Sequence, residues 1–164
     1  MKNFIRKSCL LLLLVTLVLI GTEKSANAQI YTGGTTGVSY NNGYVVELAP
    51  LIGYKYQIFS SGFSPFFSYL ESQKKYSFGG RAFSDITFYK DIFAHAEIEV
   101  SNVEKIRNNI KTREWILAMP LGGGYKYKIS DGVYAYGMIL YNVLQTSDSQ
   151  TKNPIIRGGI TYQP

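Results

Sequence analysis

The amino-acid sequence predicts an all-β protein, an eight-stranded antiparallel up-and-down transmembrane β-barrel. Three observations lead to this fold class. Apolar and polar residues alternate over long stretches, turn-forming residues separate those stretches at regular intervals, and an export signal precedes them. An alternation with a period of two places successive side chains on opposite faces of a strand. No stretch shows a sustained helical period, and the best helix candidate is the short, polar segment 103–110.

Residues 1–28 are predicted to be a cleaved secretory signal peptide, which leaves residues 29–164 as a single outer-membrane barrel domain. A basic N-terminal region precedes an apolar core at 9–20, and Ala26-Asn27-Ala28 forms a small-residue cleavage site. The apolar core is shorter than the about 20 residues that a membrane helix needs. An uncleaved N-terminal anchor is the alternative interpretation.

Charge and cysteine content argue against a nucleic-acid-binding protein and against a domain held by disulfides or by a thiolate zinc site. The signal segment carries four basic residues and one acidic residue, so its removal lowers the formal net charge from +6 to +3. The remaining charges are scattered, which gives no support for nucleic-acid binding. The only cysteine, Cys9, leaves with the signal. The exported domain therefore has neither disulfides nor a thiolate zinc site, and a core, a closed hydrogen-bond ladder or lipid must hold it together.

Turn signals divide the domain into eight expected strands. We place them at residues 31–40, 44–57, 59–70, 76–89, 91–102, 113–128, 132–145 and 154–163. Glycines in the first stretch favour a strand that begins later than residue 31. After the first turn, short connections alternate with longer or more polar ones, among them 104–112. This alternation is typical of outer-membrane barrels, which keep tight turns on the periplasmic side.

The alternation also predicts which side chains face lipid. In the stretch 44–56 the even positions are aromatic or apolar, from Tyr44 through Leu48 to Tyr56, whereas Glu47 has the other parity. The expected strands at 76–89, 91–102 and 154–163 likewise carry their charges on one parity. The stretch 113–128 has a good lipid face at its odd positions, but Ile116 and Ala118 on its other face are apolar as well. In the stretch 132–145 the alternation does not indicate clearly which face is towards lipid.

We expect the charged parity to face the barrel interior. A basic side chain on the lipid face at the bilayer midplane costs about 2–4 kcal/mol, and a buried charge needs a partner. Arg81 and Arg157 would be the cationic centres of a polar network. Its predicted members are Glu47, Arg81, Asp85, Glu97, Glu99 and Arg157.

Aromatic residues and prolines add two further expectations. Fourteen tyrosines and nine phenylalanines gather near the expected strand ends, as in the aromatic girdles at membrane interfaces. Ordinary β-propensity favours the same residue types.

Pro50, Pro65 and Pro120 fall inside expected strands, where proline removes a ladder hydrogen bond. We therefore expect bulges, kinks or strand ends near these prolines.

Candidate catalytic and binding motifs are weak. His95, the only histidine, shares a strand face with Glu97, but a serine stands at that second position in the small outer-membrane lipid esterases that this pattern resembles. His95, Glu97 and Glu99 on one strand do not easily converge on a metal ion. Gly122-Gly123-Gly124 lacks the helix and lysine of a phosphate loop. We predict no catalytic, cofactor or metal site, and we interpret His95 as a lumen or interface residue.

The chain resembles the small OmpA/OmpX-like outer-membrane β-barrels of Gram-negative bacteria, in the form common in Bacteroidetes. The residues that carry this resemblance are Glu47 to Tyr54, Tyr76 to Phe83, Phe93-Ala-His-Ala-Glu97, Leu121-Gly-Gly-Gly-Tyr125 and Arg157-Gly-Gly-Ile-Thr-Tyr162. The resemblance implies a non-enzymatic structural or surface-interaction role in the outer membrane. It implies an interior filled by side chains and not a large diffusion pore. One departure is the ending Tyr162-Gln163-Pro164, where such barrels usually end on an aromatic residue.

The resemblance also implies partners: outer-membrane lipid, the insertion machinery and periplasmic chaperones during biogenesis, and a surface partner at the outer loops, for which 104–112 is the best candidate. Two other readings stay open. One is a soluble periplasmic or secreted lipocalin-like barrel that binds a small apolar ligand, with its polar face in water. The other is an outer-membrane lipid-modifying enzyme.

Overall fold

The computed structural model describes residues 28–40, 43–107, 110–145, 149 and 152–164. Nine strand segments and one short 3-10 turn, η1 (Glu71–Gln73), make up the fold. The strands are β1 (Ala28–Tyr40), β2 (Tyr44–Tyr56), β3 (Phe59–Leu70), β4 (Lys75–Tyr89), β5 (Ile92–Arg107), β6 (Ile110–Ala118), β7 (Pro120–Ser130), β8 (Val133–Asn142) and β9 (Ile155–Tyr162). The predicted signal peptide lies outside the described residues, except for Ala28, which begins β1.

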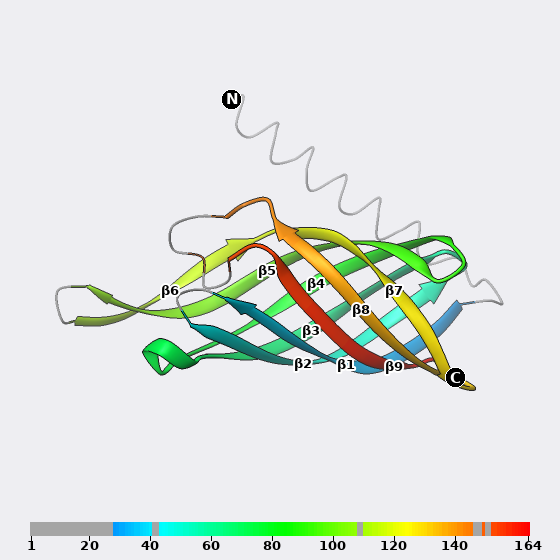
Figure 1. Ribbon diagram of the computed structural model, residues 1–164, viewed down its shortest axis with the longest axis horizontal. Coiled ribbons are helices and arrows are strands. Elements are labelled where there is room, and N and C mark those ends of the chain that lie inside the picture. Colours follow the sequence, from blue (N-terminus) through cyan, green and yellow to red (C-terminus); the bar gives the residue numbers. More distant parts are fainter. Residues whose placement is uncertain (1–27, 41–42, 108–109, 146–148, 150–151) are drawn as a thin grey trace, which may run out of the picture.

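The strands close into an antiparallel barrel, as predicted (Figure 1). Segments β6 and β7 both pair with β5 and together form the sixth of eight strands. The remaining strands each pair with the strands that precede and follow them in the sequence, and β1 pairs with β9 to complete the ring. Closure joins the first strand to the last, so that neither of them is an open sheet edge. Among the described residues, no helix is long and apolar enough to span a membrane.

The two ends of the barrel differ in their connections. Tight turns at Gln57, Lys90 and Gly132 lie at the same end as the start of β1 and the end of β9 (Figure 1). All three residues have positive φ, between 47° and 76°, as tight hairpin turns require. The opposite end carries η1, the β5–β6 hairpin and the connection from β8 to β9. We call these the turn end and the loop end.

Two expected strand limits are wrong. β1 begins at Ala28, earlier than residue 31, because its full length pairs with β2 despite the glycines. The expected loop at 104–112, which overlaps the helix candidate at 103–110, is mostly a β-hairpin. Pairing of β5 with β6 continues to Arg107 and Ile110, and this hairpin extends past the other strands (Figure 1). Residues 108–109 lie outside the described residues.

The prolines mark breaks in the ladders, as expected. The β2–β3 register places Pro50 opposite Pro65, and pairing is interrupted there between Leu48–Phe67 and Ile52–Phe63. The Ser64 hydroxyl donates to the Pro50 carbonyl at 2.8 Å, which satisfies an acceptor that a proline partner cannot reach. Pro120 begins β7 after a one-residue break, where the Met119 amide donates to the Asn142 side chain at 3.0 Å.

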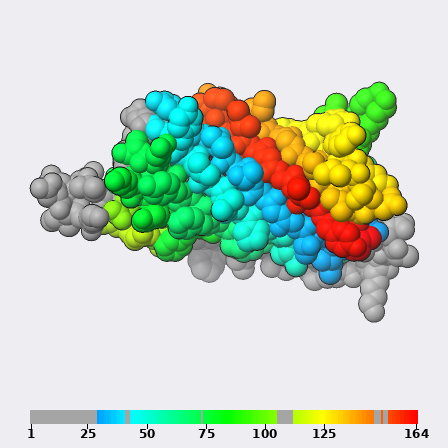
Figure 2. Space-filling view, turned by 60° about the horizontal axis from the view of Figure 1, so that its bottom comes forward, coloured from blue at the N-terminus to red at the C-terminus, as the bar shows by residue number. Residues whose placement is uncertain are grey.

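Apolar side chains cover the outside of the barrel, and polar ones fill much of the inside. Leu48, Ile98 and Ile139 are 62%, 55% and 63% exposed, whereas Glu97 between outward-facing neighbours is 3% exposed. Strand β8, which the sequence left undecided, turns Met138 and Leu140 inward and Tyr141 outward. Figure 2 shows β9 crossing the outer surface diagonally between β1 and β8, the tilt that a closed barrel requires.

Candidate functional site

The six residues predicted to form an interior network are all buried inside the barrel. They come from β2, β4, β5 and β9, and each exposes 8% or less of its surface: Glu47, Arg81, Asp85, Glu97, Glu99 and Arg157. Strand alternation explains this placement, because each residue has the parity opposite to the apolar outer face of its own strand.

Five of these residues form one ion cluster: Glu47, Arg81, Glu97, Glu99 and Arg157. The Arg157 guanidinium lies 2.5 Å from Glu97, 3.2 Å from Glu99 and 3.4 Å from Glu47. The Arg81 guanidinium lies 2.6 Å from Glu47, 3.7 Å from Glu99 and 3.9 Å from Glu97. Each carboxylate therefore contacts both arginines, the arrangement that buried charges need.

Gly37 makes the cluster geometrically feasible, and sequence reasoning missed it. This β1 residue lies opposite Glu47 on one side and opposite Arg157 on the other. A Cβ at Gly37 would lie 3.2 Å from Arg157 Cγ and 3.4 Å from Glu47 Oε1. The missing side chain lets Arg157 and Glu47 meet across the intervening strand. Only the register of three strands reveals this role.

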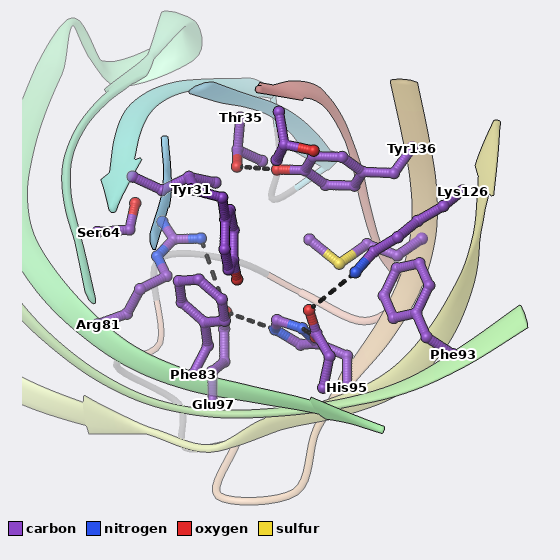
Figure 3. A pocket seen from close by; sticks show the side chains of 14 residues that line it. Tyr31, Thr35, Ser64, Arg81, Phe83, Phe93, His95, Glu97, Lys126 and Tyr136 are labelled. Carbon is purple, nitrogen blue, oxygen red and sulfur yellow. Dashed lines mark hydrogen bonds and ion pairs between the residues drawn. The ribbon is translucent and has the colours of Figure 1, made fainter. Parts of the chain in front are cut away.

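Asp85 joins the cluster indirectly, through His95. These two residues lie opposite each other across β4 and β5, and His95 Nδ1 is 2.6 Å from Asp85 Oδ1. The other ring nitrogen, Nε2, is 3.1 Å from Glu97 Oε2. Lys126 of β7, the segment on the other side of β5 from β4, lies 3.5 Å from Asp85 (Figure 3). Lys126 has the parity opposite to that of the outward-facing Tyr125 and Tyr127, and this parity is the sequence signal that could have identified it.

A small cavity lies beside His95 on the turn-end side of the ion cluster, and Figure 3 shows the side chains that surround it. Tyr31 and Tyr136 point into it, and the Tyr136 hydroxyl is hydrogen-bonded to Thr35. Its volume is about 30 Å³, room for about two water molecules. A lipid or a lipocalin-type ligand does not fit.

The arrangement around His95 does not build a nucleophile. Both ring nitrogens face carboxylates, and the hydroxyl of Ser64, the serine that lines the cavity, is engaged with the Pro50 carbonyl. A serine nucleophile needs a hydrogen-bonded base. Within the described part of the chain, no group of three or more His, Cys, Asp or Glu residues is placed to hold a metal ion. The chemistry that the site supports is charge pairing.

Comparison with known proteins gives structural matches only. No family model matches the chain, and no curated protein matches it by sequence. Neisserial surface protein A is similar in structure, with a TM-score of 0.57 and 10% identity over 85% of this chain and 98% of that one. The N-terminal β-barrel domain of Pseudomonas aeruginosa OprF has a TM-score of 0.53 and 11% identity, covering 84% and 99% of the two chains.

A de novo designed transmembrane β-barrel is also similar, with a TM-score of 0.51 and 11% identity over 87% of this chain and all of that one. At these identities the matches establish the fold, that of small outer-membrane β-barrels. They assign no activity.

Proposed function

We propose that this protein is an integral outer-membrane β-barrel with a non-enzymatic role, in which a charge-filled interior supports a hairpin that contacts a partner at the cell surface. The observation that carries the proposal is the inverted distribution of polarity. Apolar side chains cover the outer wall, while the ion cluster occupies the interior. This distribution suits lipid outside and protein inside, and the similar solved barrels support it.

The ion cluster supports a role as a rigid scaffold without a pore. Arg157 and Arg81 hold carboxylates from β2 and β5 between them, so the cluster links opposite walls. An eight-stranded barrel has an interior just wide enough for side chains. The cavity beside His95 is too small to form part of a channel past the ion cluster.

The β5–β6 hairpin is the element that we propose for surface contact. β4 and β5 pair only as far as Val103, whereas β5 and β6 continue to Arg107 and Ile110. Thr112, Arg113 and Glu114 on this hairpin are exposed. In the described part of the chain, β6 forms a ladder only with β5, and addition of a strand at the second edge of β6 is the mode of contact that we propose. Lipid, the insertion machinery and periplasmic chaperones are the further partners that this role requires.

Fractionation tests the membrane location. We expect the protein in the outer-membrane fraction, extracted only by detergent, with a folded band that shifts on heating. Recovery in the soluble fraction without detergent would overturn the proposal and favour the periplasmic alternative.

Trypsin treatment of intact cells tests the orientation, because the sequence has cleavage sites at Lys105, Arg107 and Lys111. We expect cleavage in the hairpin while the barrel stays protected. The matched control replaces residues 105–112 by Asn-Gly, which closes the Glu104–Arg113 pair with a tight turn, and it should lack the fragments that arise from cleavage at Lys105, Arg107 and Lys111. Full protection of the natural chain on intact cells would contradict the proposal that the hairpin is at the cell surface.

A further inference from the structure

An apolar groove runs along the outer wall of the barrel near the loop end. Its open volume is about 580 Å³, within the about 300–1,000 Å³ range of small-molecule sites. The residues that line it come from β3 to β6 and include Phe78, Gly80, Ala82, Ile98 and Trp115. It lies on the face opposite to the ion cluster and is separate from the cavity beside His95.

The strand register explains why the wall is hollow here. Phe78 and Trp115 flank Asn102 in one row across the strands, and their rings meet edge to face at 6.3 Å. In the next two rows towards the turn end, β4 contributes only Gly80 and Ala82. The two large rings therefore border a patch of small residues, and this difference in side-chain size leaves the groove in the outer wall.

The loop end of the groove carries a positive charge. Arg113 precedes Trp115 by two residues and lies on the same face of β6, about 7 Å closer to the loop end. Its guanidinium donates to Asn102 Oδ1 at 2.9 Å and lies 5.3 Å from the centre of the Phe78 ring. Asn102 faces outward and is nevertheless only 8% exposed. These contacts fix Arg113 above the groove.

Glu104 lies opposite Arg113 in the β5–β6 register. A guanidinium has five N–H donors in a planar fork, of which Asn102 takes one, so a carboxylate and a further anion can both bind it.

We propose that this groove binds one acyl chain of an anionic membrane lipid that carries a phosphate and that Arg113 binds this phosphate. The inference rests on the proposed membrane location. Trp115 and Phe78 are placed as interfacial aromatic residues, so the row beyond them, with Arg113, lies at headgroup depth, and the apolar floor below lies at acyl-chain depth. Lipid that merely surrounds the barrel would have no preference for this position or for a charged headgroup.

Trp115 provides a direct probe, because it is the only tryptophan of the chain and it is exposed beside the groove. The experiment reconstitutes the full-length mature protein in phosphatidylcholine vesicles. One set of vesicles contains a fraction of brominated phosphatidylglycerol, and the other contains the same fraction of brominated phosphatidylcholine. In both lipids the bromine is near the carbonyl end of the acyl chain, and it quenches the fluorescence of a tryptophan that it touches. We expect phosphatidylglycerol to occupy the site about fivefold more readily, the preference expected from one basic side chain at a membrane surface.

Three variants make the result specific. Arg113→Gln should abolish the headgroup preference while Trp115 is still quenched. Ala82→Leu should fill the groove floor and reduce quenching by both lipids. The control is Ala94→Leu, which adds the same side chain at another exposed alanine of the outer wall that does not line the groove, and it should behave like the natural chain.

Two failures are distinguishable. If the protein does not insert into vesicles and shows no heat-shifted band, the proposed function fails and the lipid site fails with it. If the protein inserts but both brominated lipids quench Trp115 equally, or Ala82→Leu leaves the quenching by both lipids unchanged, the lipid site alone is wrong.

Discussion

At the scale of single residues, Arg157 has the most demanding environment in the barrel. Its side chain is 2% exposed and contacts three carboxylates that originate on two other strands. In water each of these groups would be solvated separately, so the buried cluster is stable only while its members stay together. The stability of the interior therefore depends on complete charge pairing.

Replacing Arg157 by Met should destabilise the barrel by about 3–5 kcal/mol, because three buried carboxylates would keep only the Arg81 guanidinium and His95 as partners. Urea unfolding in detergent micelles measures this loss. Lys128→Met is the control, since Lys128 pairs with the fully exposed Asp131 and should unfold like the natural chain. An equal effect of both substitutions would show that the ion cluster adds no stability.

A second residue-scale prediction concerns Gly37. The Gly37→Ala methyl would press against Arg157 and Glu47, which cannot retreat without breaking their ion pairs. We expect a loss of about 1–3 kcal/mol in the free energy of unfolding, as for other overpacked sites. Gly137→Ala provides the matched control, because nothing lies within 4 Å of its added Cβ. That variant should stay within about 0.5 kcal/mol of the natural chain. Unaltered stability of Gly37→Ala would remove the proposed steric role.

At the scale of elements, each strand has two faces whose environments differ sharply. In β5, the outward residues Ile98 and Val100 alternate with the buried Glu97 and Glu99. Shifting the register of such a strand by one residue would exchange its faces and place carboxylates on the apolar outer surface. The outward face also accommodates polar groups where they can pair, as Ser61 and Ser84 do at 2.9 Å.

Depth along a strand should determine the cost of an outward-facing charge. Ile98 lies near the middle of the β4–β5 ladder, whereas Tyr125 faces outward opposite Ile92 near the turn end. Arginine should cost about 2–4 kcal/mol at Ile98 and about 0–1 kcal/mol at Tyr125. The fraction of protein that folds into lipid vesicles, read from the heat-shifted band, measures the difference. Equal folding of Ile98→Arg and Tyr125→Arg would contradict the assignment of the lipid-facing surface.

At the scale of the whole molecule, the barrel is closed around its charges. The β1–β9 pairing closes the ring of strands, and the ion cluster connects β2, β4, β5 and β9 across the interior. Closure and pairing support each other, since the cluster can form only when all four strands have their final register.

We therefore expect vesicles that contain the protein to be as impermeable to small sugars as empty vesicles. Osmotic swelling after mixing with a sugar solution measures permeation. The double variant Arg157→Ala with Glu97→Ala removes both partners of the shortest ion pair and should increase permeation. Rapid swelling with the natural chain would mean that the interior is open.

Much of the fold could be predicted, because a strand encodes its two faces locally. The parity of Glu47 or Arg157 is visible in a few neighbouring residues, and it agrees with the faces that the structure shows. The prolines likewise reveal ladder breaks from their own chemistry. Tyrosine-rich β8 could not be assigned, since tyrosine suits an interior, an interface and a strand equally well. The length of the β5–β6 hairpin was missed because polar residues are compatible with both a loop and an exposed hairpin.

The sequence by itself determined the fold class, the apolar outer surface and the set of charged residues that face inward, because all three follow from a period of two along the chain. Only the tertiary structure decided which charges pair, that His95 bridges Asp85 and Glu97, that Gly37 makes room for Arg157, and where the outer wall is hollow. Those features depend on the register between strands. Register is set jointly by turns and by partners that lie far apart in the sequence, so no single segment contains it.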